Sequence, residues 1–236
     1  QFQSATGKDV TGALEKLMNK QKLKGLVLDL RNNPGGVLRA SVDVAGLFMD
    51  GGKVVYTEGR LPNSDMEFNA QPEDATAGIP IVVLINSGSA SASEIVAGAL
   101  QDHGRAVIMG TRSFGKGSVQ TVLPISDSRA VKLTTALYFT PNGRSIQAEG
   151  IEPDIEVERA KVTAYDNSRR VTEADLTGHL NNANGEDQSK SKKPASRLLS
   201  RDNQLYEALT LLKGINILGL RDNKTANIEQ DARGES

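Results

Sequence analysis

Three short apolar runs alternate with helical patterns in the first half of the chain, and this alternation constrains the fold more than any other feature. The segments 8–21, 41–49 and 90–100 have helical character. Strands that are apolar along their whole length are buried on both faces, as in parallel sheets covered by helices. We therefore expect an α/β layered core. The apolar runs lie at 26–30, 81–85 and 106–109.

The second half of the chain changes character. Shorter alternating stretches at 131–136 and 138–140, followed by a Pro-Asn-Gly turn, predict hairpin structure. Leucines at helical spacing then predict a C-terminal helix, which either packs on its own domain or joins two copies. The expected organisation is a core at 1–160, a polar linker at 161–196, a helix at 197–220 and a flexible tail at 221–236.

Composition excludes several kinds of site. The chain has no cysteine, which rules out disulfides, thiol catalysis and thiolate metal ligands. With only His103 and His179, a multi-histidine metal site or a histidine-based triad has little material, so a hydrolytic nucleophile needs another base. The net charge of -1 gives no indication of a nucleic-acid partner.

The beginning of the chain reads as the interior of a protein. No apolar run approaches the roughly 20 residues of a membrane span, and the first residues lack the pattern of a signal peptide. Because the opening Gln1-Phe2-Gln3 resembles the middle of a strand, we expect a fragment of a longer protein. The chain itself therefore carries no signal for its localisation.

Serines crowd the expected strand-to-helix turn at 86–94, which reads Asn-Ser-Gly-Ser-Ala-Ser-Ala-Ser-Glu. The first turn of a helix offers unpaired N–H groups and the positive end of the helix dipole, which suit a developing oxyanion. A nucleophilic serine is physically sensible at this position. A helix cap and turn without catalytic function explains the same residues.

A lysine between two glycines follows the third apolar run, in the segment Phe114-Gly115-Lys116-Gly117. A lysine serves as a general base only where an apolar environment favours its neutral form, and Phe114 is a candidate for part of that environment. A solvated loop lysine is the alternative. The pattern of a phosphate-binding loop fails, because a glycine follows the lysine where a serine or threonine is required.

A third polar turn, Arg31-Asn32-Asn33-Pro34-Gly35-Gly36, directly follows the first apolar run. The carboxyl ends of parallel strands are where α/β proteins place their sites, and a glycine amide there can face a carbonyl oxygen. Taken alone, this is also an ordinary turn at the end of a strand.

Together, these segments resemble the successive blocks of the carboxy-terminal processing (tail-specific, CtpA-type) serine peptidases. The blocks are 28–36, 88–95, 110–117 and Gly-Ile-Glu-Pro-Asp at 150–154, in the family's order over about residues 1–160. The resemblance implies a ClpP/crotonase-like fold and a serine endopeptidase that processes or degrades proteins near their C-termini, with no metal or cofactor.

The resemblance also implies roles for individual residues. Ser91 matches the nucleophile, Lys116 the general base and Gln120 the residue that orients the lysine. The backbone amides of Ala92 and Gly35 match the oxyanion hole, with Gly36 as the alternative to Gly35.

Partners and location follow from the same resemblance. It implies protein or peptide substrates, homo-oligomers with a contribution from the C-terminal helix, lipoprotein adaptors in some members, and a periplasmic or cell-envelope location. Family members normally carry a PDZ domain before the Gln1-Phe2-Gln3 segment, and we expect this chain to be the core without it.

Two rival interpretations keep the fold. One is a resting or non-catalytic protein-binding core, in which Lys116 is turned away from Ser91. The other is a crotonase-type acyl-thioester enzyme, which would explain neither the Ser-Lys pair nor Gln120.

Overall fold

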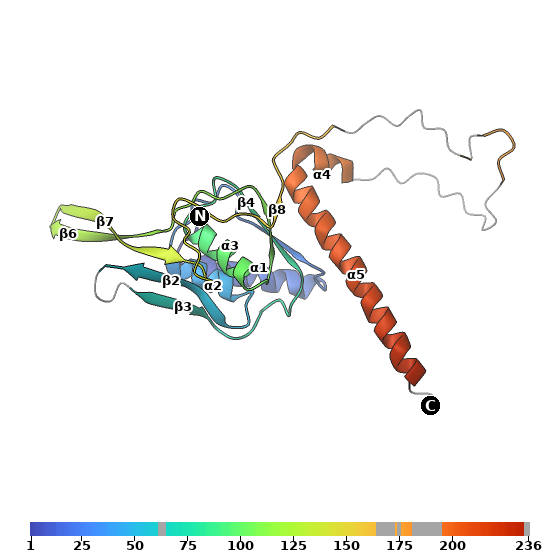
Figure 1. Cartoon of the computed structure of the whole chain (residues 1–236), viewed down its shortest axis with the longest axis horizontal. Coiled ribbons are helices and arrows are strands. Elements are labelled where there is room, and N and C mark those ends of the chain that lie inside the picture. Colours follow the sequence, from blue (N-terminus) through green and yellow to red (C-terminus); the bar gives the residue numbers. More distant parts are fainter. Residues whose placement is uncertain (61–64, 164–172, 174–175, 181–194, 234–236) are drawn as a thin grey trace.

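A parallel sheet forms the centre of the molecule (Figure 1). The computed structural model describes residues 1–60, 65–163, 173, 176–180 and 195–233. The sheet has the order β1-β4-β5-β8, and each neighbouring pair is parallel. All five residues of β4 are buried, as expected for an apolar strand covered on both faces. The strands are β1 (Leu26–Asp29), β4 (Ile81–Ile85), β5 (Val107–Gly110) and β8 (Ile155–Glu156).

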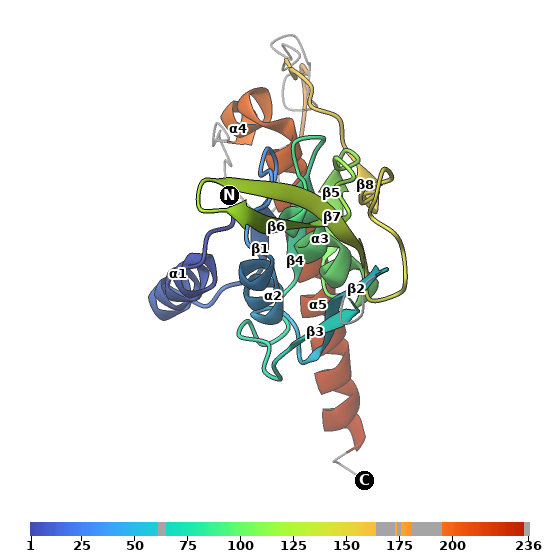
Figure 2. The same ribbon diagram turned by 90° about the vertical axis from the view of Figure 1, so that its left-hand side faces the viewer.

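Helices cover one face of this sheet and enclose the main core. Helix α3 (Ala92–Asp102) is buried from Ala92 to Leu100, and α2 (Leu38–Gly46) packs beside it (Figure 2). Helix α1 (Thr6–Lys20) contributes Leu14 to the same core. The predicted helices and apolar strands are therefore confirmed, with ends displaced by up to three residues.

A second, antiparallel sheet has the order β3-β2-β7-β6. Its long hairpin extends away from the body of the molecule, and β6 forms one edge (Figure 1). The hairpin was predicted, but its strands are longer than the alternating stretches indicated, and β2 and β3 were not predicted. The strands are β2 (Gly52–Gly59), β3 (Met66–Ala70), β6 (Ser118–Ser126) and β7 (Arg129–Phe139).

The other face of the parallel sheet is covered by the C-terminal helix. After α4 (Ala195–Arg201), helix α5 (Asn203–Arg233) places Ala208 and Leu212 on Val82, Leu84 and Met109. The helix therefore packs on its own domain, which the leucine pattern alone left open. None of the described helices is both long enough and apolar enough to cross a membrane.

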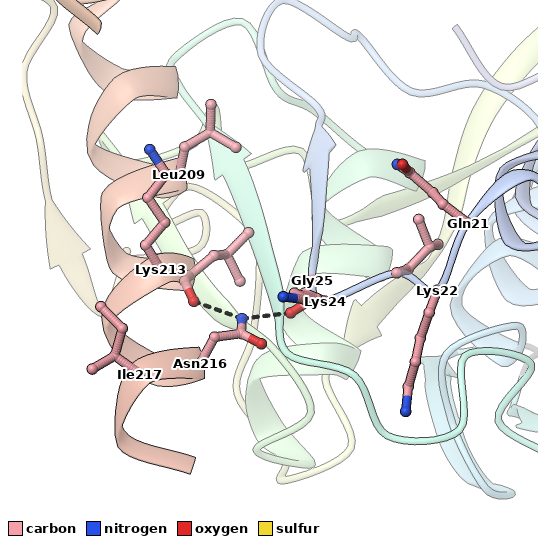
Figure 3. A pocket seen from close by; sticks show the side chains of 10 residues that line it. Gln21, Lys22, Lys24, Gly25, Leu209, Lys213, Asn216 and Ile217 are labelled. Atoms are coloured by element: carbon pink, nitrogen blue, oxygen red, sulfur yellow. Dashed lines mark hydrogen bonds between the residues drawn. The ribbon is translucent and has the colours of Figure 1, made fainter. Parts of the chain in front are cut away.

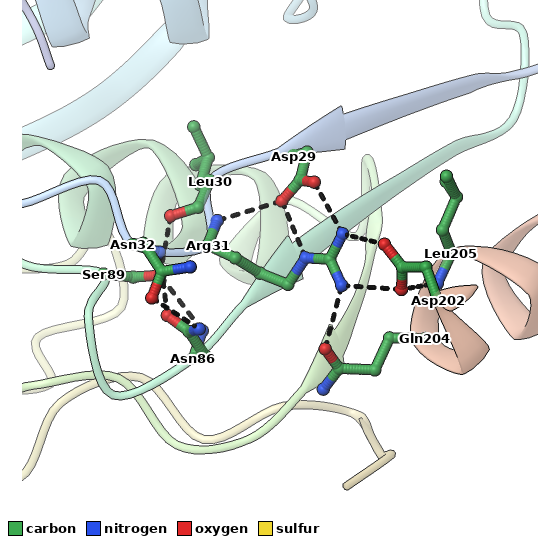
Figure 4. Close-up of polar contacts among 9 residues, drawn as sticks. All are labelled: Asp29, Leu30, Arg31, Asn32, Asn86, Ser89, Asp202, Gln204 and Leu205. Carbon is green, nitrogen blue, oxygen red and sulfur yellow. Dashed lines mark hydrogen bonds and ion pairs between the residues drawn. The ribbon is translucent and has the colours of Figure 1, made fainter. Parts of the chain in front are cut away.

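Polar contacts fasten α5 at both ends of β1. Before the strand, Asn216 donates from Nδ2 to the Lys24 carbonyl at 2.5 Å, beside a pocket between α5 and the loop into β1 (Figure 3). After the strand, Arg31 binds Asp202 (Figure 4). Residues 202–216 of a helix span about 21 Å and residues 24–31 of an extended chain about 23 Å, so the helix and strand are matched in length.

Of the expected domain boundaries, the one between the C-terminal helix and the tail differs from the structure. The core at 1–160 includes both sheets and helices α1 to α3, and helix α5 continues to Arg233, so most of the tail expected at 221–236 is helical. Most of the linker expected at 161–196 lies outside the described residues.

Candidate active site

Three loops that follow adjacent parallel strands meet at the carboxyl ends of those strands. Strands β1, β4 and β5 are neighbours, and the turns after them are the three polar segments singled out in the sequence. Ser89 joins them: its Oγ donates to the Leu30 carbonyl at 2.7 Å, and its carbonyl accepts the Phe114 amide at 2.9 Å. The fold thus brings the Ser91 and Lys116 loops together.

Ser91 lies at the N-cap of α3 in a strained conformation. Its backbone has φ 55° and ψ -115°, outside the regions that residues with a side chain prefer. Such strain costs about 1–3 kcal/mol and persists only where the surroundings enforce it, typically at functional sites. A serine on a sharp turn between a strand and a helix is the arrangement of a nucleophile elbow.

The glycine turn after β1 packs directly against Ser91. A Cβ atom on Gly35 would lie 2.4 Å from the Ala90 carbonyl oxygen and 2.9 Å from Ser91 Cβ. The Asn33 carbonyl fixes this approach by accepting the Ala90 amide at 3.0 Å and the Ser93 hydroxyl at 2.9 Å. Only glycine permits so close an approach of the two backbones.

A buried carboxylate connects the serine and lysine loops. Glu94 is fully buried, and each of its oxygens accepts two hydrogen bonds. Oε2 accepts the amides of Ser91 at 2.7 Å and Lys116 at 2.9 Å, and Oε1 accepts the Gly115 amide and the Ser113 hydroxyl, each at 2.6 Å. The backbones that carry the two predicted catalytic residues are therefore bound to one side chain.

Glu94 lies within the serine-rich motif at 86–94, but the sequence pattern predicted no role for it. The available signal was its position three residues after Ser91, the spacing of a capping box.

Glycines also force the Lys116 loop into its position. Gly115 has φ 89°, and a Cβ atom on Gly117 would lie 2.4 Å from the Gln147 amide nitrogen. Lys116 is half-buried, whereas the Phe114 side chain is 66% exposed. About two thirds of Phe114 is thus open to solvent, so that its contribution to an apolar environment for the lysine stays a prediction.

The side chains of the predicted trio are not hydrogen-bonded to one another. Gln120 is exposed on β6, four residues after the half-buried Lys116. In the described part of the chain, no hydrogen bond joins the Ser91 hydroxyl, the Lys116 ammonium and the Gln120 amide. The backbones of the two loops are thus hydrogen-bonded together, whereas the three side chains make no hydrogen bond to one another in the described residues.

Two backbone amides of the loops around Ser91 are unpaired in the described part of the chain. Neither the Ala92 nor the Gly36 amide has an acceptor within the described residues. The Gly35 amide already donates to Asn33 Oδ1 at 3.1 Å. Of the two candidate glycines, Gly36 is therefore the one whose amide is unpaired, and the choice between them stays a prediction.

The fold and this constellation are those of an α/β hydrolytic enzyme with a serine at a strand-to-helix turn. Residues 1–157 match the family described as Peptidase family S41. The chain therefore belongs to peptidase family S41, a family of serine peptidases.

Similar proteins agree with this assignment. A carboxy-terminal-processing protease of Bartonella bacilliformis is 49% identical over 224 residues, which cover 91% of this chain and 50% of the relative. A carboxyl-terminal-processing protease of Synechocystis is 44% identical, with coverage of 69% and 38%. Among solved structures, a photosystem II D1 C-terminal processing protease is similar at a TM-score of 0.61 and 41% identity, covering 66% of this chain and 40% of that one. The chain thus spans at most about half the length of these relatives.

Proposed function

We propose that this chain is the catalytic core of a C-terminal processing endopeptidase that uses a Ser91-Lys116 dyad. The observation that carries the proposal is the Glu94 carboxylate, which holds the strained Ser91 and the Lys116 loop together at the carboxyl edge of the sheet. A purely structural helix cap would not explain why the same carboxylate also binds the lysine loop.

The proposed reaction begins with attack of Ser91 Oγ on the scissile carbonyl carbon while neutral Lys116 Nζ takes the hydroxyl proton. The amides of Ala92 and Gly36 then stabilise the oxyanion. Lys116 returns the proton to the leaving amine, and the C–N bond breaks to give an acyl-enzyme. A water molecule, deprotonated by Lys116, attacks this ester, and the product acid and Ser91 hydroxyl are released.

Gln120 has a proposed orienting role in this reaction. Its side chain is exposed on β6, four residues after Lys116, and its amide oxygen could accept a hydrogen bond from the ammonium when substrate is bound. A substrate lying over the half-buried lysine would also exclude water from it.

The test is cleavage of unfolded casein by the whole chain, with product identification by mass spectrometry. Ser91→Ala should abolish cleavage, and Lys116→Arg should do so because a guanidinium does not lose its proton at usable pH. Ser87→Ala, an exposed serine of the same loop, and Lys132→Arg, an exposed lysine of β7, are matched controls that should retain activity. Cleavage by Ser91→Ala would exclude Ser91 as the nucleophile.

A resting core is the second candidate function. It is favoured because, among the described residues, no hydrogen bond joins the Ser91 and Lys116 side chains, and because Phe114 is exposed. In that case neither the parent chain nor any variant should cleave casein, while a longer protein containing the same core should.

The setting of the reaction is proposed from family resemblance. We propose that the enzyme cleaves protein substrates near their C-termini and is located in the cell envelope. We also propose a homo-oligomer that works with a lipoprotein adaptor, and a ClpP/crotonase-like layering. The parallel sheet with its site at the carboxyl ends of the strands supports the layering. Cell fractionation of the source organism would test the location, since a cytoplasmic pool alone would contradict it.

A further inference from the structure

The C-terminal helix contacts the strand that leads into the glycine turn of the candidate site. The match to the peptidase family ends at residue 157, whereas α5 begins at Asn203. Even so, residues at the start of α5 bind the end of β1 (Figure 4). This contact is not part of the dyad or of the oxyanion hole.

A single guanidinium makes the contact. Arg31 Nε and Nη2 donate to the two oxygens of Asp29 at 2.9 and 2.7 Å. Nη1 and Nη2 donate to the two oxygens of Asp202 at 2.9 and 2.7 Å, and Nη1 also donates to Gln204 Oε1 at 2.9 Å. The Arg31 side chain is only 13% exposed, whereas the side chains of Asp29 and Asp202 are 47% and 30% exposed. Two bidentate carboxylates fix both the position and the plane of the fork.

The partners on the helix are themselves fixed. Asp202 Oδ1 accepts the Leu205 amide at 3.0 Å and so caps the first turn of α5. Gln204 Nε2 donates to the Val157 carbonyl at 2.6 Å, next to β8. The helix residues that bind the guanidinium are therefore held by hydrogen bonds that lie outside the glycine turn.

Arg31 is in turn directly connected to the turn that faces Ser91. The next residue, Asn32, donates its amide to Asn86 Oδ1 at 2.9 Å, and the Asn33 carbonyl receives the Ala90 amide and Ser93 hydroxyl. Gly35 then lies against Ser91 with no room for a Cβ atom. A shift of Arg31 would thus move Gly35 and Gly36 relative to the nucleophile.

We propose that the start of α5 acts through Arg31 to hold the glycine turn in register with Ser91. Arg31, Asp202 and Gln204 are positioning residues, and the C-terminal helix belongs to the support of the oxyanion hole. The catalytic consequence rests on the proposed function, whereas the mechanical coupling of helix to turn does not.

The structure supplies a matched control for simple fastening of the helix. Asn216 holds the same helix to the opposite end of β1, through Lys24, away from the turn (Figure 3). If the Arg31 contact only attached α5 to the body, losing either fastening would have similar effects on the turn.

The first measurement is amide hydrogen exchange of residues 30–38 in the whole 236-residue chain. Asp202→Asn combined with Gln204→Ala, and separately Arg31→Lys, should speed exchange in this segment by about tenfold, because the turn opens more often. Asn216→Ala should leave it unchanged. Exchange in β4, which reports global unfolding, should speed less in every variant than exchange in the turn, which shows that the turn opens locally in a folded chain. Unchanged exchange in the turn, or equal acceleration in Asn216→Ala, would overturn the proposal.

Peptide hydrolysis supplies the catalytic readout. A displaced oxyanion donor weakens binding of the transition state more than binding of substrate, so kcat should fall about tenfold or more while KM stays within about twofold. Asp202→Glu should recover part of the loss, and Asn216→Ala should keep parent kcat. A parent that cleaves while the Asp202 variants keep full kcat would refute the catalytic role. If the parent and Ser91→Ala are equally inactive, the proposed function fails. Hydrogen exchange then still tests whether the start of α5 is coupled to the glycine turn.

Discussion

At the scale of single residues, the site is built from constraints that the surroundings impose on the backbone. Ser91 has a positive φ, its amide donates to Glu94, and Gly35 lies so close to it that a Cβ atom on the glycine would not fit. Glu94 sits among four donors with no exposure to water. Each of these features has a measurable energetic signature.

The strain at Ser91 predicts a difference between two inactive variants. Ser91→Ala removes the hydroxyl and keeps the strain, whereas Ser91→Gly removes both, because glycine accepts positive φ. The glycine variant should be more stable by roughly 1 kcal/mol, measured as the free energy of unfolding in urea. Equal stabilities, or a less stable glycine variant, would indicate that the conformation carries no strain.

The four hydrogen bonds to Glu94 predict a large effect of a nearly isosteric change. Glu94→Gln places an amide NH2 group where two donors already point, leaving buried polar groups unpaired. The free energy of unfolding should fall by about 2–4 kcal/mol, and casein cleavage should fall with it as the Ser91 and Lys116 loops separate. Glu152→Gln, at an exposed carboxylate, is the control. A fully stable and active Glu94→Gln would show that the carboxylate is dispensable.

At the scale of elements, the second face of the parallel sheet depends on one turn of α5. Leu212 is 6% exposed and packs on Gly25, whose Cβ position lies 3.0 Å from a Leu212 methyl carbon. Leu218, on the same helix, is 60% exposed. Among the side chains of α5 that the structure describes, those that attach the helix to the sheet lie in its first half.

Truncating these leucines should have unequal effects. Leu212→Ala should lower the free energy of unfolding by about 2–4 kcal/mol, from lost burial and the remaining cavity. Leu218→Ala should change it by less than about 0.5 kcal/mol. Denaturation in urea measures both, and a similar small effect for the two leucines would contradict docking of α5 on the sheet.

At the scale of the whole molecule, two half-buried carboxylates, those of Asp74 and Asp202, connect distant segments and make stability depend on pH. The hydrogen bond from Arg31 lowers the pKa of Asp202 below its usual value. For Asp74, burial acts to raise the pKa, but hydrogen bonds from Thr76 and the charge of Arg105 outweigh it, so the pKa is lowered.

The sign of the pH effect follows from these directions. A carboxyl whose pKa is lower in the folded than in the unfolded state stabilises the fold fully above the unfolded value of about 3.9, and this stabilisation is lost as pH falls through the folded value. The destabilisation caused by Asp74→Asn or Asp202→Asn, measured in urea, should therefore be largest near pH 6 and shrink below about pH 4. A constant difference from pH 6 to pH 3 would contradict both shifts.

The sequence by itself determined the layered α/β core and the identity of the chemical groups. Apolar runs such as 81–85 report burial on both faces, and four short blocks are specific enough to identify a peptidase family. These are local properties of the chain, since periodicity and motif spacing need no knowledge of what lies across the sheet. Strands β2 and β3 escaped prediction because half-buried antiparallel strands leave a weaker pattern.

Only the tertiary structure decided which groups are paired and which are open. In the structure the Gly35 amide binds Asn33, whereas the Gly36 amide is unpaired among the described residues. Phe114 is exposed, and Glu94 lies between two loops. The start of α5 lies against Arg31. Each of these depends on contacts between segments far apart in the sequence. Hydrogen-bond pairing and desolvation are properties of such contacts, so no pattern within one segment specifies them.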